Sequence, residues 1–201
     1  MKIKPFLQVL ALALLLPALA AAQPAVYKVD PNHSSVGFSI RHFVSNVPGR
    51  FRDFNGVIKY DRQNPTASSV EFTVQAASIT TDNTDRDEHL RSADFFDVQK
   101  FPTLTFTSTK VAARDASTLD VTGDLTLHGV TKPITIPVSV LGTMKGPRGE
   151  KAGFETSFTL NRKEYGIVWN RVFDAGNTLL GDEVRVSIGI EADQQVPAAG
   201  K

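Results

Sequence analysis

The segment Ile134-Thr135-Ile136-Pro137-Val138-Ser139-Val140 decides the fold class of this chain. Apolar side chains occupy every second position in it. Alternation with a period of two places one face of a β-strand against a core and the other against water. The segment therefore predicts a strand in a sheet that is apolar on one side only.

The same alternation recurs along the rest of the chain. Seven further segments show it, at 36–40, 54–60, 70–76, 103–107, 121–127, 154–160 and 184–191, and Tyr27 with Val29 offers a short additional edge strand. Turn residues at 64–65, 128–133 and 146–149 separate consecutive strands, as in antiparallel hairpins. Eight such strands predict an all-β domain in which the sheet closes into a barrel. At this size the lumen is either filled by side chains or wide enough for one small ligand.

Two segments interrupt the strand pattern. Between residues 80 and 102 the period changes, and Asp82, Asn83 and Thr84 are candidate N-caps, which predicts a short helical insertion at about 83–97. The second interruption, at 161–182, contains the single tryptophan, Trp169. We expect it to form a long ordered loop at one mouth of the barrel, where such loops are often functional.

The beginning of the chain has the three-part layout of a secretory signal peptide. Lys2 and Lys4 form a basic start, an apolar run covers 6–16, and small residues occupy 20–22. We expect cleavage after Ala22 and export of one domain at 23–195, followed by a disordered tail at 196–201. The chain contains no cysteine, so its stability must come from its core.

Composition and motifs argue against several classes of function. The formal net charge is +1 and no basic cluster stands out, so no nucleic-acid partner is expected. No serine lies in a Gly-x-Ser-x-Gly motif, and the glycines occur singly rather than in a phosphate-binding loop. We therefore expect no enzyme, no catalytic residue and no cofactor.

Four histidines and one charge cluster are candidates for metal binding or acid-base catalysis. His33, His42, His89 and His128 are too widely spaced for a typical zinc site, so no metal is predicted and local hydrogen bonds are expected. The segment Arg86-Asp87-Glu88-His89 offers an acid and a base, but a cluster of charges that holds a loop in place is favoured.

Phenylalanine is the abundant aromatic residue, with 13 copies against three tyrosines and one tryptophan. Phe38, Phe72, Phe106 and Phe158 fall on the apolar faces of their strands. Because the phenyl ring has no polar group, it suits either a dry core or the wall of a hydrocarbon-binding site. Periodicity alone leaves a packed barrel and a hollow barrel equally supported.

Several motifs resemble those of the YceI-like family of bacterial lipid-binding proteins. They occur in family order from about Tyr27 to Glu191, and Tyr165 is the one position where phenylalanine is the commoner residue. The motifs are Tyr27-Lys28-Val29-Asp30, His33-Ser34-Ser35-Val36-Gly37-Phe38, Gly49-Arg50-Phe51, Phe54-Asn55-Gly56, Arg86-Asp87-Glu88-His89-Leu90-Arg91-Ser92, Asp94-Phe95-Phe96-Asp97, Phe101-Pro102, Gly123-Asp124-Leu125-Thr126-Leu127-His128-Gly129-Val130-Thr131, Asn161-Arg162, Tyr165-Gly166-Ile167 and Gly181-Asp182-Glu183-Val184.

The resemblance implies an extended eight-stranded antiparallel barrel of lipocalin type in the periplasm. It also implies a hollow apolar lumen that holds a long isoprenoid chain, such as a polyprenyl lipid or a quinone tail. It implies no catalytic residue. It also implies that the charged residues at 86–92 hold the helical insertion in place across the barrel. We expect the ligand to contact Phe38, Ile40, Phe51, Phe72, Val74, Leu90, Phe95, Phe96, Phe106, Leu125, Phe158 and Trp169.

Two alternatives remain at this point. One is a ligand-free barrel that acts through protein partners in an envelope stress response. The other is an enzyme that acts on a lipid headgroup with His89 or His42 as its base. Transient contact with a membrane surface and a homodimer are compatible with the carrier hypothesis.

Overall fold

A computed structural model describes residues 23–147, 149–172 and 178–195 of the chain. The predicted signal peptide at 1–22 and the predicted tail at 196–201 lie outside these residues. The strands are β1 (Ala25–Val29), β2 (Ser35–His42), β3 (Ser45–Phe51), β4 (Phe54–Tyr60), β5 (Ser69–Gln75), β6 (Ile79–Thr80), β7 (Thr103–Ala113), β8 (Thr118–Leu127), β9 (Val130–Gly146), β10 (Gly149–Asn161) and β11 (Leu180–Gln194). The helices are α1 (Thr84–Arg91) and the short 3-10 helices η1 (Pro31–His33), η2 (Pro65–Ala67), η3 (Ala76–Ser78) and η4 (Arg162–Tyr165).

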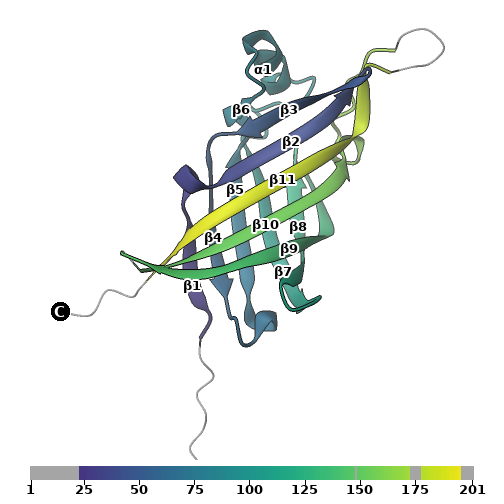
Figure 1. Cartoon of the computed structure of the whole chain (residues 1–201). Coiled ribbons are helices and arrows are strands. Elements are labelled where there is room, and N and C mark those ends of the chain that lie inside the picture. The colour runs from purple at the N-terminus through teal and green to yellow at the C-terminus, as the bar shows by residue number, and fades with distance from the viewer. Residues whose placement is uncertain (1–22, 148, 173–177, 196–201) are drawn as a thin grey trace, which may run out of the picture.

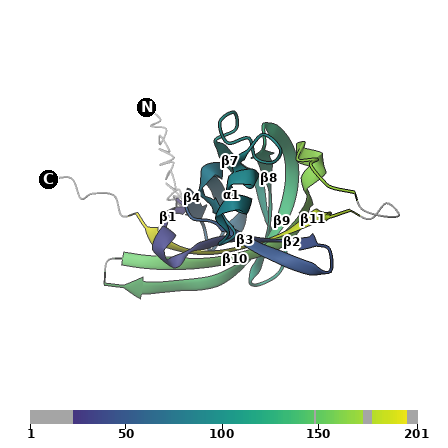
Figure 2. The same cartoon turned by 90° about the horizontal axis from the view of Figure 1, so that it is seen from above.

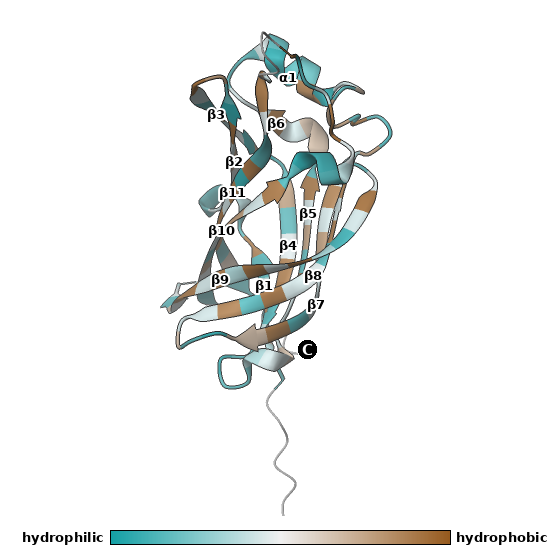
Figure 3. Ribbon diagram, turned by 90° about the vertical axis from the view of Figure 1, so that its right-hand side faces the viewer, coloured by the Kyte–Doolittle hydropathy of each residue, from teal (hydrophilic) through white to brown (hydrophobic). Residues whose placement is uncertain are grey.

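Eight strands form a closed antiparallel ring, which confirms the predicted fold class (Figure 1). Its order is β1-β4-β5-β7-β8-β9-β10-β11, and the pairing of β1 with β11 closes it. Strands β2, β3 and β6 continue the sheet from the first half of β11. Figure 3 shows apolar and polar residues alternating along the strands, as the period of two requires.

Strands β1 and β2 both pair with the same edge of β11. Residues of β1 pair opposite Ala192 and its neighbours, whereas β2 pairs along the segment from Leu180 to Gly189. Between the two strands, η1 bends the chain. The side chain of Asp30 caps η1 by accepting a hydrogen bond from the Asn32 amide at 3.0 Å, and a proline begins it. This bend lets the sheet curve away from the ring at the end that carries α1.

Strands β3 and β6 were absent from the sequence prediction. Strand β3 contains Pro48, a residue that is disfavoured in the interior of a strand. In the structure, Pro48 lies opposite Ser39 of β2, while the other edge of β3 pairs with β6 only at Arg50 and Phe51. Proline is tolerated on an edge strand because its missing N–H faces away from the ladder. The two-residue strand β6 is too short to show any period.

The turn between β8 and β9 agrees with its predicted hairpin. His128 and Gly129 have φ angles of +51° and +73° and form a two-residue connection. Positive φ at both positions is the requirement of a type I′ turn, whose twist matches that of the flanking strands. The ladder then extends well beyond the predicted 134–140 segment, because β9 continues to Gly146 and pairs with β10.

Helix α1 lies across one end of the barrel, within the predicted insertion (Figures 1 and 2). Asn83 is its N-cap and accepts a hydrogen bond from the Arg86 amide at 3.0 Å. The segment after the helix buries Phe95 and half-buries Phe96 against the barrel. Among the described residues, no helix is both long and apolar enough to cross a bilayer.

Candidate ligand site: an apolar cavity along the barrel axis

The barrel encloses a cavity of about 570 Å³. This volume lies in the range of about 300–1,000 Å³ that is common for small-molecule sites. Along β11 the lining residues run from Leu180 to Ile190, which is about 33 Å at about 3.3 Å per residue. The cavity is therefore long and narrow rather than spherical.

Partial exposure of inward-facing side chains shows that the barrel is hollow. On β11, Val184, Val186 and Ile188 line the cavity and are only half-buried, although β10 and β2 pair with the two edges of this part of the strand. A lumen packed throughout would bury them fully, as it buries Val121 and Ile136, which border the cavity on β8 and β9. Periodicity could not distinguish these two cases.

All twelve residues predicted to contact a ligand line this cavity. Most come from the strands, whereas Leu90 belongs to α1, Phe95 and Phe96 follow it, and Trp169 lies on the loop after η4. Their contact with a ligand remains a prediction. The structure adds lining residues that the sequence did not single out, among them Ile167, Leu179 and Leu180.

Three of the predicted phenylalanines lie over glycines of neighbouring strands. A β-carbon at Gly56 would lie 2.6 Å from the Phe72 ring, and one at Gly123 would lie 2.6 Å from the Phe106 ring. Phe38 covers Gly49 in the same way. Because each ring occupies the place of a missing side chain on a neighbouring strand, large aromatic residues are accommodated without filling the lumen.

The cavity is lined mainly by aliphatic and phenyl side chains. At the end that carries α1, the lining includes the polar residues Thr81, Asp85, Arg86 and His89. Further along the wall, Thr105 on β7 and Thr156 on β10 also belong to the lining, and the Thr156 hydroxyl donates to the Pro137 carbonyl at 2.6 Å. Such a lining stabilises a long apolar chain and offers it few hydrogen bonds.

Asp87 and Arg86 hold α1 in place, as the sequence analysis predicted. The buried carboxylate of Asp87 accepts hydrogen bonds from the Thr81 amide at 2.7 Å, the Thr81 hydroxyl at 2.6 Å and the Thr80 hydroxyl at 2.9 Å. Burial by itself would raise the pKa of Asp87, but these hydrogen bonds hold it below its ordinary value. Exposed Arg86 donates from Nε to the Thr81 hydroxyl and from Nη2 to the Thr81 carbonyl.

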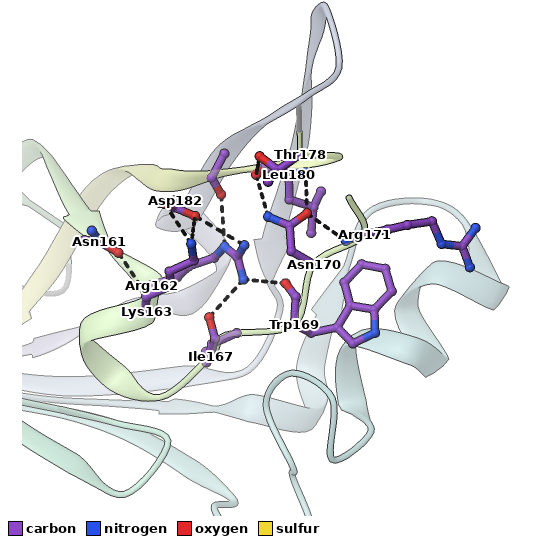
Figure 4. Close-up of polar contacts among 11 residues, drawn as sticks. Asn161, Arg162, Lys163, Ile167, Trp169, Asn170, Arg171, Thr178, Leu180 and Asp182 are labelled. Atoms are coloured by element: carbon purple, nitrogen blue, oxygen red, sulfur yellow. Dashed lines mark hydrogen bonds and ion pairs between the residues drawn. The ribbon is translucent and has the colours of Figure 1, made fainter. Parts of the chain in front are cut away.

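A buried arginine organises the loop that carries Trp169 (Figure 4). Arg162, only 3% exposed, donates from Nη1 to the carbonyls of Ile167 and Trp169 at 2.9 and 2.8 Å, and from Nε to that of Gly181 at 2.9 Å. Burial lowers the pKa of Arg162, an effect opposed by Asp182, whose carboxylate lies 3.6 Å from Nη2. The sequence analysis gave Arg162 no role, although an arginine that directly follows an apolar strand was a usable signal.

Trp169 joins this loop to α1. Its ring centroid lies 5.0 Å from that of His89 and 5.1 Å from that of Phe95. His89 is oriented in turn by the carboxylate of Asp94, at 2.8 Å from Nε2. The loop, predicted to lie at one mouth, therefore closes the same end of the cavity as the helix.

His128 and His33 are engaged by neighbouring polar groups, whereas His42 lines the cavity. His128 Nδ1 lies 3.1 Å from the Tyr165 carbonyl. His33 Nδ1 lies 2.7 Å from the Asp30 carboxylate, which raises the pKa of His33. The side chains of Asp30, His33 and Glu191 lie close enough together to hold a metal ion. However, the Lys151 ammonium already pairs with the Glu191 carboxylate at 2.8 Å.

A closed antiparallel barrel around a long apolar cavity defines a lipocalin-like barrel protein. The chain belongs to the YceI-like family, because the model of the YceI-like domain matches residues 27–192. Protein YceI of Escherichia coli O6:H1 is 40% identical over 193 residues, which cover 92% of this chain and 96% of that protein.

Solved structures agree with this assignment. The YCEI protein of Campylobacter jejuni is 34% identical, with a TM-score of 0.67 over 83% of this chain and 96% of that one. A polyisoprenoid binding domain from Saccharophagus degradans shares the fold at 18% identity, with a TM-score of 0.64 over 86% of this chain and 99% of that one.

Proposed function

We propose that this protein binds a long isoprenoid lipid, a polyprenyl lipid or the tail of a quinone, inside the barrel. The observation that carries the proposal is the long cavity, whose wall is formed mainly by aliphatic and phenyl side chains. Each buried methylene group would contribute about 0.8 kcal/mol. A polyisoprenoid binding domain with the same fold supports this class of ligand.

We further propose that the protein is a periplasmic carrier rather than an enzyme. The lumen wall offers a hydrocarbon chain apolar contacts along its length, while the histidines His89 and His128 are engaged in local hydrogen bonds. The signal-like layout of residues 1–22 supports export. Mass analysis of the exported protein is expected to find Gln23 at its N-terminus, and a membrane-bound chain that still begins at Met1 would contradict this.

A carrier that exchanges lipid must touch a membrane for a short time. We therefore include transient contact with a membrane surface in the proposed function. A homodimer is compatible with this function.

The test is extraction of protein purified from a bacterial host that makes polyprenyl lipids and quinones. Mass spectrometry of the solvent extract is expected to find a lipid of defined mass at close to one molecule per protein. Phe158→Asp, which places a charge on the cavity wall, is expected to abolish this lipid. Thr159→Asp, on the exposed face of the same strand, is the matched control and should retain it. Lipid-free wild-type protein would favour the hypothesis of a barrel that acts through protein partners.

A further inference from the structure

Three chain segments meet at the mouth of the cavity beside α1. They are the turn between β2 and β3, the loop after η4 and the start of β11 (Figure 1). The Phe43 amide donates to the Leu179 carbonyl at 3.0 Å, and the Leu179 amide donates to the Arg171 carbonyl at 2.9 Å. These two hydrogen bonds place the three segments side by side, and we call their described residues at 42–45, 167–172 and 178–180 the rim.

The rim carries a concentration of exposed apolar side chains. Val44 is 103% exposed, Val172 66% and Val168 63%. Together with Phe43, they make up four of the seven large hydrophobic residues that are exposed within the described parts of the chain. Four exposed apolar residues on adjoining segments are a concentration that points to an interaction surface, whereas single scattered apolar residues are ordinary surface composition.

These exposed residues are direct continuations of the cavity wall. His42, which precedes Phe43 and Val44, lines the cavity, and so do Ile167 and Trp169 on either side of Val168. Leu179, at the centre of the hydrogen-bonded junction, lines it as well. An apolar chain that leaves the lumen at this end therefore meets apolar side chains outside it.

The rim itself contains Arg171 and no aspartate or glutamate, and Arg41 directly precedes its first segment. The nearest acidic residues in the sequence are Asp174, between the second and third segments, and Asp182, after the third. Arg41 is held at the turn by a hydrogen bond from Nη1 to the Phe43 carbonyl at 3.0 Å. Arg171 extends away from the loop that Arg162 holds (Figure 4). Exposed apolar side chains flanked by arginines are the combination that binds the interface of an anionic bilayer.

We propose that the rim docks on anionic lipid bilayers, with Val44, Val168 and Val172 inserted at the interface, so that lipid enters and leaves the cavity at this mouth. This assignment rests on the proposed lipid-carrier function and names the surface through which the carrier would act. A second copy of the chain fits the rim less well, because a symmetric contact would bring arginines of like charge together.

The experiment measures co-sedimentation of delipidated protein with vesicles. Wild type is expected to bind vesicles that contain phosphatidylglycerol and to bind phosphatidylcholine vesicles much more weakly. The double variant Arg41→Gln/Arg171→Gln is expected to weaken partitioning by about 30-fold, at about tenfold or less for each arginine. Val44→Asp and Val168→Asp should also weaken it, whereas Val44→Leu should not. Because these side chains are exposed, unfolding midpoints should stay at the wild-type value.

The matched control is Met144→Asp, at the opposite end of the sheet. Met144 is 76% exposed, so this variant, like Val44→Asp and Val168→Asp, replaces an exposed apolar side chain by a charge. The proposal expects it to leave vesicle binding unchanged. An equal loss with Met144→Asp, or no binding of wild type to anionic vesicles, would overturn the proposal. A wild-type dimer that Val44→Asp dissociates without loss of vesicle binding would assign the rim to a second copy. Lipid content is measured separately, so absence of bound lipid would count against the carrier function and absence of vesicle binding against the rim.

Discussion

The phenyl ring of Phe38 lies over the α-carbon of Gly49, its partner across the ladder between β2 and β3. A side chain at Gly49 would overlap the tip of this ring. Because both residues face the cavity side of the sheet, the glycine keeps the ring against the wall and the lumen open. Phe72 lies over Gly56, its partner across the ladder between β4 and β5, in the same way. A phenyl ring over a cross-strand glycine is therefore a repeated feature of the sheet.

Gly49→Ala is expected to turn the Phe38 ring into the lumen and to reduce the amount of bound lipid. The end of a side chain, rather than backbone, must move, so the free energy of unfolding should change little. Mass spectrometry of extracted lipid measures the effect. Gly37→Ala is the control, because its β-carbon would lie in ordinary contact, 3.5 Å from the Ser187 carbonyl. Equal lipid content in both variants would contradict this role of Gly49.

Phe106→Ala and Phe158→Ala should differ in delipidated protein. Phe106 is 8% exposed and packs over Gly123, so its loss is expected to lower the free energy of unfolding by about 3–5 kcal/mol. Phe158 is half-buried and borders the cavity, so its truncation should cost less stability and should weaken lipid binding. Urea unfolding and lipid titration measure the two quantities. Equal losses of stability would indicate that the lumen is packed around Phe158.

Asp87→Asn should destabilise the protein by about 1.5–3 kcal/mol at pH 7, because both carboxylate oxygens accept hydrogen bonds whereas an amide accepts at its oxygen only and is uncharged. The pKa of Asp87 is lower in the folded chain than in the unfolded chain, so its contribution is complete above about pH 4. It is lost as the pH falls further through the lowered pKa.

The difference in unfolding free energy between wild type and Asp87→Asn should therefore shrink below about pH 4. Denaturant unfolding at several pH values measures it. Asp85→Asn, at an exposed position on the same helix, is the control and should cost under about 1 kcal/mol. A difference that persists at low pH would show that the carboxylate is not the stabilising species.

Arg162→Lys should loosen the loop that carries Trp169. Lysine keeps the charge but cannot donate to the carbonyls of Ile167, Trp169 and Gly181 together. Since Trp169 is the single tryptophan, its fluorescence reports on this loop, and we expect emission at longer wavelength. Lys163→Arg, at the exposed neighbouring position, should leave the spectrum unchanged. An unchanged spectrum for Arg162→Lys would show that other contacts hold the loop.

Local sequence was sufficient to predict the strands whose inward and outward faces differ in polarity. The Ile134–Val140 pattern and the His128-Gly129 turn belong to this group, and so does the Asn83 cap of α1. Local sequence was not sufficient to predict β3, because Pro48 within it is a residue that usually ends a strand. Only the pairing partners of β3 show that its proline lies at an edge that can tolerate it.

The sequence by itself determined a closed, one-sided apolar sheet with a helical insertion, because alternation and capping act over a few neighbouring residues. Only the tertiary structure decided that the barrel is hollow. The same inward phenylalanines suit a packed core or a cavity, and the outcome depends on glycines of adjacent strands over which the rings lie. The role of Arg162 and the grouping of the rim valines were decided in the same way, since both depend on hydrogen bonds between segments far apart in the chain.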